Sequence, residues 1–419
     1  MNRLLYTVFL FLYHAGIRVA ALFNPKAKKW VAGRRAVFSR LKSAIGSGNR
    51  IIWMHCASLG EFEQGRPVLE QLKKEYPAHQ MLLTFFSPSG YEVRKNYAGA
   101  DWVFYLPPDG KKNAARFIET VKPELAIFVK YEFWFYYLNA IRKNKVPLLL
   151  ISAIFREKQP FFRWYGALHR QMLRCFSHIF VQDRPSLQLL HRHFPGLPVS
   201  VAGDTRFDRV AALRTDAAAI PLIEAWIKHS PVIVAGSTWP EDERLLQKVM
   251  AAFPGTDLII APHEITETHI RQLHEFFPQA QLYSSLQNGE TSRQATGSRI
   301  LIIDNIGMLS RLYSYGKIAY IGGGFGKGIH NTLEAAVYGM PVLFGPAFQK
   351  FKEAKDLVAN GAALPVANDE EAVAGIQKLL ADATLYSSAA AAAAAYVQTS
   401  TGATRLITGY IQEKRLLTS

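Results

Sequence analysis

Cysteine is scarce in this chain, and its scarcity excludes several classes of protein. Only Cys56 and Cys175 occur among 419 residues. Two cysteines cannot form the disulfide framework of a small secreted domain, and so low a count fits a reducing compartment. The sequence also has no Cys/His spacing typical of a zinc site and no recognisable nucleic-acid-binding motif. We therefore predict no metal site and no nucleic-acid partner.

Acidic residues are missing from the beginning of the chain. Residues 1–50 contain ten Lys or Arg and no Asp or Glu, and the first acidic residue is Glu61. The formal net charge of +16 at pH 7 is therefore unevenly spread along the sequence. A basic N-terminus next to an apolar segment indicates an anionic membrane surface more than a nucleic acid.

A long uninterrupted hydrophobic run is lacking as well. Leu4 to Tyr13 is apolar or aromatic, and the pattern resumes weakly from Ile17 to Phe23. Because a bilayer span needs about twenty apolar residues, this segment is of borderline length. We predict that residues 1–24 form an uncleaved anchor that lies in or barely crosses the membrane, with the basic stretch Lys26–Lys42 on its cytoplasmic side. An ordinary buried helix remains the alternative.

Short apolar runs that alternate with helical patterns fill the rest of the chain. The length predicts two domains, and a hydrophobic content of 49% suits well-packed α/β layers. Such alternation predicts two doubly wound parallel sheets. We expect a loop over residues 283–299 and a helix over the alanine run 389–395. The expected strands are 51–54, 81–86, 102–106, 125–129, 146–152, 178–181, 199–202, 231–235, 258–261, 300–303, 318–321 and 341–344.

The most distinctive stretch runs from Ile318 to Pro346, with a glycine-rich turn between two apolar runs. It predicts a βαβ unit whose loop lies at the carboxyl end of a strand, where α/β sheets bind ligands. The glycines would let backbone N–H groups approach an anion, and Asn331 or Thr332 would cap the following helix. Glu334 falls in its first turn, where its carboxylate could instead accept hydrogen bonds from sugar hydroxyls. Alternatively, the glycines only make a tight crossover.

Two glutamates follow strand-like runs in the first half of the chain. Glu61 comes just after the run that begins at Ile51, and a carboxylate there could take a proton from an acceptor hydroxyl. Its alternative role is that of a first-turn glutamate favoured by the helix dipole. Glu132 lies among aromatic residues after the run that ends at Val129, and its alternative role is a structural ion pair with Lys130 or an arginine.

Basic residues near other strand ends suit an anionic ligand. Arg206, in a polar turn, could contact a phosphate or carboxylate bidentately, and His263 could meet a phosphate or ribose. For His263 a simple capping role is equally open. The mixed basic and aromatic stretch 155–176 fits either a lipid interface or an ordinary amphipathic helix.

In their order and spacing, these motifs resemble those of the Kdo transferases (glycosyltransferase family 30), which add 3-deoxy-D-manno-octulosonic acid (Kdo) to the lipid A precursor of Gram-negative bacteria. The resemblance covers nearly the whole chain. It rests on residues 55–61 with Arg66-Pro67, 132–134, 203–208, 236–238, 262–263 and the block 322–346.

The resemblance implies a GT-B architecture of two Rossmann-like domains with the site in the cleft between them. The expected divisions are a membrane anchor (1–24), an acceptor domain (25–215), a CMP-Kdo donor domain (216–395) and a C-terminal helix (396–419) that could pack back on the first domain. The donor would be CMP-Kdo, with no cofactor. The acceptor would be the lipid A precursor (lipid IVA) at the cytoplasmic face of the anionic inner membrane.

Individual site residues follow from the same resemblance. Glu61 matches the family's proposed catalytic base, and Glu132 and Arg206 match positions taken to stabilise the transition state. The segments that hold CMP match Pro262, His263, Gly307, Met308, Leu309, Asn331, Thr332, Leu333 and Glu334.

This chain departs from the family pattern at several of these positions. Lys130 replaces an acidic residue, Phe135 replaces a proline, and Arg206 stands where many relatives have lysine. Met308 offers no carboxylate where relatives often have glutamate. These departures weaken the roles of Lys130 and Met308 more than they weaken the family assignment.

The sequence thus predicts an inverting, metal-independent glycosyl transfer with Glu61 as the base. No Asp-x-Asp motif suited to a nucleotide-bound divalent ion occurs in the sequence. Two other functions remain open. One is a nucleotide-sugar epimerase with the same two-lobed fold, and the other is a non-catalytic membrane-surface protein that binds lipid A.

Overall fold

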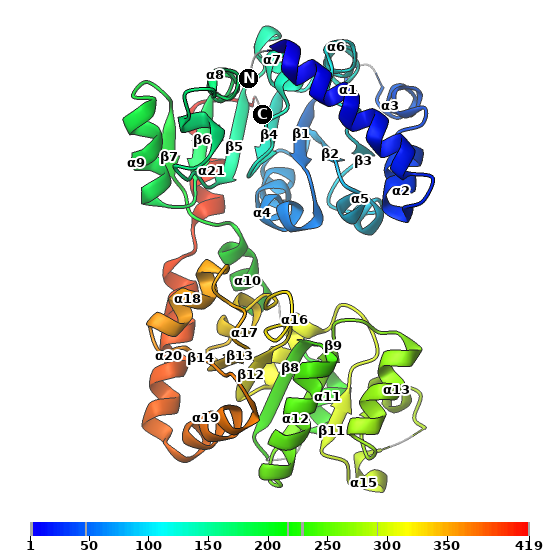
Figure 1. The fold of residues 1–419 in the computed structure, drawn as a ribbon, viewed down its shortest axis with the longest axis vertical. Coiled ribbons are helices and arrows are strands. Elements are labelled where there is room, and N and C mark those ends of the chain that lie inside the picture. Colours follow the sequence, from blue (N-terminus) through cyan, green and yellow to red (C-terminus); the bar gives the residue numbers. More distant parts are fainter. Residues whose placement is uncertain (1–2, 47, 216–217, 228–229, 291, 418–419) are drawn as a thin grey trace. The chain divides into compact units, whose positions relative to one another are not determined.

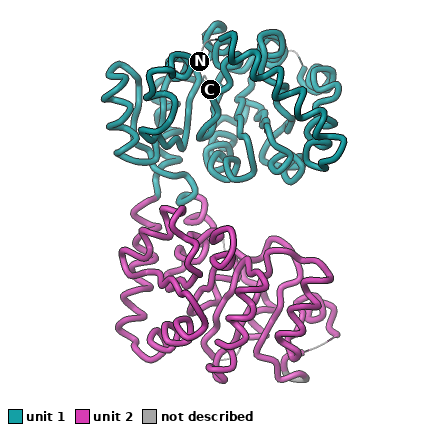
Figure 2. The backbone as a smooth tube through the Cα atoms, in the orientation of Figure 1, with its two compact units in different colours: residues 1–208, 401–419 teal, residues 209–400 magenta. Residues whose placement is uncertain are grey.

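The computed structural model describes residues 3–46, 48–215, 218–227, 230–290 and 292–417. The chain divides into two compact units (Figure 2). Unit 1 runs to Asp208 and takes in the segment from Thr401, whereas unit 2 runs from Arg209 to Ser400. The boundaries predicted from the sequence, 215/216 and 395/396, lie a few residues away from these divisions.

Unit 1 is built on a seven-stranded parallel sheet with the order β3-β2-β1-β4-β5-β6-β7 (Figure 1). All residues of the three central strands are buried. Strands covered on both faces need apolar side chains at nearly every position, which the continuous apolar runs supply. The strands are β1 (Ile51–Cys56), β2 (Gln80–Phe85), β3 (Trp102–Tyr105), β4 (Leu125–Val129), β5 (Leu148–Ala153), β6 (His178–Val181) and β7 (Val199–Val201).

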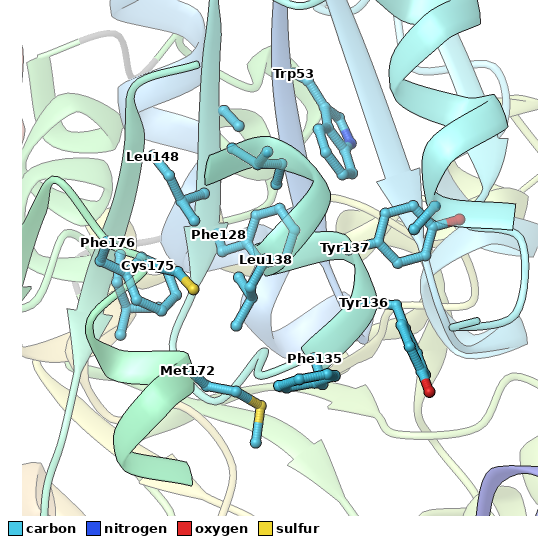
Figure 3. Packing of buried hydrophobic residues seen from close by; sticks show 14 of the residues in the cluster. Trp53, Phe128, Phe135, Tyr136, Tyr137, Leu138, Leu148, Met172, Cys175 and Phe176 are labelled. Atoms are coloured by element: carbon cyan, nitrogen blue, oxygen red, sulfur yellow. The ribbon is translucent and has the colours of Figure 1, made fainter. Parts of the chain in front are cut away.

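Helices cover both faces of this sheet. Successive residues of β1 enter different cores: Ile51 and Trp53 belong to one, Ile52 and Met54 to the other. Figure 3 shows part of the first core, where Trp53, Phe128 and Tyr137 pack together. The helices are α1 (Arg3–Ala20), α2 (Pro25–Gly33), α3 (Val37–Ala44), α4 (Leu59–Glu75), α5 (Pro88–Arg94), α6 (Lys111–Val121), α7 (Phe135–Lys143), η1 (Pro160–Phe162), α8 (Ala167–Leu173), α9 (Arg184–His193) and α21 (Ala403–Glu413), with α10 (Arg206–Thr215) at the division.

Unit 2 contains a second seven-stranded parallel sheet, with the order β10-β11-β9-β8-β12-β13-β14. Two hydrophobic cores again lie on its opposite faces. The predicted pair of doubly wound parallel sheets is therefore confirmed. The strands are β8 (Val232–Thr238), β9 (Asp257–Pro262), β10 (Gln281–Leu282), β11 (Ile300–Ile302), β12 (Ile318–Ile321), β13 (Val342–Phe344) and β14 (Ala363–Pro365).

The helices of unit 2 differ from the prediction in two places. The expected loop over 283–299 contains two short helices, because Tyr283 is buried in the core and Ser284 is held by Asp304. The helix after the glycine turn is a single turn. The helices are α11 (Pro221–Trp226), α12 (Pro240–Ala252), α13 (Glu267–Phe276), α14 (Tyr283–Gln287), α15 (Arg293–Thr296), α16 (Leu309–Leu312), η2 (Tyr313–Tyr315), α17 (Leu333–Ala336), α18 (Lys352–Ala359), α19 (Asp369–Ala381) and α20 (Ala383–Thr399).

Helix α1 packs on unit 1 through a few residues and exposes most of its apolar side chains. Tyr6 and Leu10 are buried, and the Tyr6 hydroxyl donates to Asp109 at 2.7 Å. Among the described residues, no single helix is long and apolar enough to cross a membrane, whereas α1 and α2 pass that test as a pair bent by 118°. The exposed large apolar residues here are Leu4, Leu5, Val8, Phe9, Phe11, Leu12, Tyr13, Val19, Leu22 and Phe23.

The C-terminal helix α21 belongs to unit 1. Its apolar face, including Ile407 and Ile411, joins the core around α4. The carboxylate of Asp208 accepts from the backbone N–H groups of Gly402 and Thr404 at 2.5 and 2.6 Å, which satisfies donors at the start of the helix.

Candidate functional site

The candidate residues of unit 1 lie at the carboxyl edge of its sheet. Glu61 is in the first turn of α4, directly after β1, and Glu132 is in the turn after β4. Arg206 begins α10 after β7. Since parallel strands end at the same edge, the sequence predicts that these residues share one side of the unit.

Glu61 is partly buried and is held by the turn that precedes its own helix. Its Oε2 accepts from the backbone N–H of Ala57 at 2.5 Å. Burial, and then the negative charge of Glu132, raise the pKa of Glu61 to about 8, against the opposing effects of the Ala57 N–H and Lys130. The first-turn role and the base role are therefore compatible. A carboxyl group with this pKa is suited to accepting a proton near neutral pH.

Glu132 is 5% exposed and receives two short hydrogen bonds on the same oxygen. Nε2 of His55 lies 2.9 Å from its Oε2, and Nε1 of Trp134 donates to that atom at 2.6 Å. A partner of this buried glutamate is thus a histidine of β1. Together the two contacts hold the carboxylate group in place.

Arg206 is tied to a neighbouring carboxylate. Its Nε and Nη2 donate to Oδ2 of Asp204 at 2.9 and 2.7 Å. Asp204 also accepts a hydrogen bond from Nε2 of Gln64, which lies one helical turn beyond Glu61 on α4. The Arg206 turn is therefore anchored to the helix that carries Glu61, and the Arg206 side chain is 30% exposed.

In unit 2, three aromatic rings stack at the ends of the central strands. Trp239 lies after β8 and His263 after Pro262 at the end of β9, with ring centroids 4.7 Å apart. His330 stacks on the other imidazole at 4.3 Å, and its Nε2 accepts from Nε1 of Trp239 at 3.2 Å. Burial, and then His263, lower the pKa of His330 to about 4, so this ring is neutral at pH 7.

The glycine turn allows backbone segments to pack closely against one another. A Cβ on Gly322 would lie 2.3 Å from the Ser237 carbonyl oxygen, and one on Gly324 would lie 2.4 Å from Gly345 N. The N–H groups of Gly322, Gly323, Gly326 and Gly328 all donate within the protein. The expectation that these four groups face an anion is therefore wrong, because the turn uses them to hold itself together.

The segment Asn331–Glu334 keeps part of its expected role. Asn331 Oδ1 accepts from the Leu333 N–H at 3.2 Å, and its Nδ2 donates to Glu334 at 3.0 Å, so Asn331 rather than Thr332 caps the short α17. Burial raises the pKa of Glu334, whereas Asn331 and Arg209 lower it. Thr332 is fully buried, and within the described chain its hydroxyl has no hydrogen-bond partner. An unsatisfied hydroxyl of this kind suits a ligand contact.

Residues Gly307, Met308 and Leu309 form the start of another short helix. Gly307 has φ 100°, which a residue with a Cβ rarely adopts. Met308 is 7% exposed and packs in the core of unit 2 with Leu309 at its edge. This segment can therefore offer backbone groups, while the Met308 side chain is part of the core.

The structure also adds three residues that the sequence did not single out. His55 joins Glu132, whereas Trp239 and His330 join His263. Two features of the sequence could have pointed to the histidines. His55 is a polar residue near the end of a buried run, and His330 is adjacent to a predicted site residue.

Comparison with known proteins identifies relatives over most of the chain. Residues 32–209 match the family model of 3-deoxy-D-manno-octulosonic-acid transferase (kdotransferase). The chain is 28% identical over 349 residues to such a transferase from Aquifex aeolicus, which covers 81% of this chain and 88% of that protein. The corresponding Haemophilus influenzae enzyme is 24% identical over 80% of this chain and 79% of its own.

Solved structures with the same fold include proteins of different activities. The UDP-GlcNAc 2-epimerase of Neisseria meningitidis superimposes with a TM-score of 0.61 at 17% identity, covering 87% of this chain and all of that chain. A glycosyltransferase from Rickettsia africae gives 0.54 at 12% identity over 87% of this chain and 98% of its own. These similarities show a GT-B type fold, two Rossmann-like sheets, without deciding between the two activities.

The motifs at the strand ends, the family model and the curated relatives agree on one enzyme family. The chain is therefore similar to the Kdo transferases, which are glycosyltransferases: residues 32–209 match their family model, and its curated relatives along most of its length are Kdo transferases.

Proposed function

We propose that this protein transfers Kdo from CMP-Kdo to a hydroxyl of the lipid A precursor, with inversion at the anomeric carbon and with Glu61 as the general base. The observation that carries this mechanism is the partly buried Glu61 carboxylate beside Glu132, with its pKa raised to about 8. Such a group is basic enough to accept the hydroxyl proton at near-neutral pH.

The chemical step moves one proton and exchanges one bond. A glucosamine hydroxyl of the acceptor loses its proton to Glu61 as its oxygen attacks the anomeric carbon of Kdo. The new C–O bond forms while the bond from that carbon to the CMP phosphate oxygen breaks. CMP then leaves with the bonding electrons and its negative charge. Arg206, oriented by Asp204, is suited to balancing the charge that develops on the leaving phosphate.

Unit 2 supplies groups of the kind that a nucleotide requires. The stack of Trp239, His263 and His330 offers aromatic faces and ring nitrogens, and Asn331 with Glu334 offers an amide and a carboxyl group for sugar hydroxyls. The buried Thr332 hydroxyl is a further candidate contact. The proposal includes no metal: activity that withstands a chelator supports this point, and activity restored only by a divalent ion contradicts it.

We further propose that the protein works at the cytoplasmic face of the inner membrane. Helix α1 exposes a continuous apolar surface, and the segment after it carries exposed basic residues, including Lys26, Lys28 and Lys29. An apolar helix face with cations beside it is typical of helices that lie in an anionic membrane interface.

Mass spectrometry of the acceptor tests the proposed reaction. The purified full-length protein is incubated with CMP-Kdo and lipid IVA in detergent. We expect the lipid mass to increase by one or more Kdo units and CMP to be released. An unmodified lipid, together with interconversion of UDP-GlcNAc by the same preparation, would instead favour an epimerase. Binding of lipid IVA without either reaction would favour a non-catalytic lipid-binding protein.

A further inference from the structure

His55 is a fully buried polar residue on β1, one of the three central strands of unit 1. In the sheet register it lies beside Thr84 of β2 on one side and Phe128 of β4 on the other. The Phe128 ring packs edge-on against the imidazole, with centroids 5.2 Å apart. The ring is therefore fixed in orientation at the carboxyl edge that also carries Glu132.

Hydrogen bonds connect His55 to residues on both sides. Its Nδ1 lies 2.9 Å from Oγ1 of Thr84 and 3.1 Å from the carbonyl oxygen of that residue. Its Nε2 lies 2.9 Å from Oε2 of Glu132. At the far end, Nε1 of Trp53 donates to Thr84 Oγ1 at 2.8 Å. Four side chains thus form one buried chain from β1 and β2 to the turn after β4.

The hydrogen-bond partners of His55 fix the orientation of its ring. An indole N–H can only donate, so Thr84 Oγ1 accepts from Trp53. Both oxygens of Thr84 lie next to Nδ1, and the ring therefore presents Nε2 to Glu132. Because a carboxylate oxygen can only accept, this contact is a hydrogen bond when Nε2 carries a proton.

We propose that His55 is a positioning residue for the transfer reaction: through Nε2 it holds the Glu132 carboxylate in place beside Glu61. This inference rests on the proposed role of Glu61 as the base. The contacts of Nδ1 with both oxygens of Thr84, and the edge-on packing of Phe128, fix the ring in the orientation that this role requires.

The groups around the two carboxylates agree with this role. Glu132 is faced by His55 and Trp134. Glu61 is faced by Glu132, Lys130 and the N–H groups of Ala57 and Ser58, with Cys56 and Tyr131 near enough to be influenced by its charge. Of the side chains that act on Glu61, Glu132 is the one that raises its pKa. A change that weakens or displaces the Glu132 charge must therefore lower that pKa.

Two substitutions of His55 separate positioning from packing. H55L removes the donor to Glu132 and keeps an apolar side chain, whereas the amide of H55Q can still donate near the position of Nε2. The matched control is H79L, because His79 is also buried and also pairs with a glutamate, Glu124, at 3.0 Å. That pair lies at the amino ends of β2 and β4, at the opposite edge of the sheet from Glu61.

NMR tests the contact between His55 and Glu132 without using catalysis. In protein with ¹⁵N-labelled histidine, with the His55 signals identified by their absence in H55Q, we expect a proton on Nε2, where the Glu132 carboxylate can accept it. A ring protonated at Nδ1 alone would overturn the proposal. If H55L does not fold, T84V provides the second variant, because loss of the hydroxyl that orients the ring should weaken its contact with Glu132.

The titration of Glu61 is the second readout, from ¹³C-labelled glutamate with the signal identified in E61Q. We expect its pKa to fall from about 8 toward the ordinary value of 4.5 in H55L, to recover in H55Q, and to stay unchanged in H79L. An unchanged pKa in H55L would contradict the role of His55.

Transfer rates complete the test. The acidic limb of the pH–rate profile should move with the Glu61 pKa in H55L, and the maximal rate should drop by ~10²-fold, as expected for a misplaced catalytic group. A wild-type protein that shows these titrations but no transfer would refute the proposed function and leave the coupling standing. If the wild-type protein transfers Kdo normally but the pKa of Glu61 is the same in H55L, only this inference is refuted.

Discussion

At the scale of single residues, the reactivity of Glu61 is set by its neighbours more than by its position in the sequence. The same carboxylate accepts from the Ala57 N–H, which stabilises its anion, and faces Glu132, which destabilises it. Burial and the second charge prevail, so its pKa rises to about 8. A glutamate with only the first-turn contact would be acidic and a poor base.

His330 provides a residue-scale prediction for nucleotide binding. H330A removes one ring of the stack and the acceptor of the Trp239 N–H. We expect CMP affinity, measured by calorimetry, to fall about tenfold, which corresponds to ~1.4 kcal/mol and to the loss of one aromatic contact. The control is H274A, on α13 and outside the stack. Equal CMP affinity in H330A and the wild type would exclude the stack from the donor site.

Sequence reasoning could find some of these residues and not others, for physical reasons. Glu61 and Glu132 could be singled out because a charge directly after a buried strand is costly unless it is used or paired. His55 could not be assigned a partner, since its neighbours in the sheet, Thr84 and Phe128, are 29 and 73 residues away along the chain. The Trp239–His330 contact is non-local in the same way, joining the ends of different strands.

At the scale of elements, most strands can be located from their apolar runs in the sequence, whereas two edge strands of unit 2 cannot. Strands β4 and β6 have the predicted limits, because each is a buried run bounded by polar residues. The edge strands β10 and β14 were missed, since they contain only two and three residues and few of their side chains are buried. The glycine turn was located correctly, but the N–H groups of four of its glycines bond within the protein.

Helix α1 gives the element-scale prediction. Phe11 of α1 and Phe23 in the turn after it are 72% and 86% exposed, so replacing both with glutamate should leave unit 1 folded. We expect binding to phosphatidylglycerol vesicles, measured by co-sedimentation, to drop by roughly 10²-fold, because two apolar contacts with the lipid would be lost. L406E, at an exposed position of α21, is the matched control. Unaltered sedimentation of the double variant would refute interfacial binding by α1.

At the scale of the whole molecule, the C-terminal segment of the chain, from Thr401, belongs to unit 1. The C-terminal residues Ile407, Ile411 and Leu417 complete a core whose other buried members lie within residues 52–180. Contacts between segments so far apart in sequence are not visible in local patterns. The sequence could suggest such a return only through resemblance, while the structure assigns the segment from Thr401 to unit 1.

A substitution of Asp208 tests how the C-terminal segment is held on unit 1. D208N removes the negative charge that accepts from Gly402 and Thr404, at the start of α21. We expect unit 1 to lose about 1–2 kcal/mol of unfolding free energy, the usual contribution of a charged helix cap. Urea unfolding followed by tryptophan fluorescence measures this, with D369N, at the start of α19 in unit 2, as the control. Equal destabilisation by both variants would show that the effect is not specific to the α21 cap.

The role of Glu61 as the base is tested by the single-turnover rate of Kdo transfer between pH 6 and 9 in the wild type, E61Q and the neighbouring control E63Q. Because a base acts only when deprotonated, the wild-type rate should rise about tenfold per pH unit and level off above pH ~8. E63Q should follow the same curve. E61Q should bind CMP-Kdo normally and be slower by ~10²–10⁴-fold, without that rise. A fast E61Q with the wild-type pH profile would contradict the assignment of Glu61 as the base.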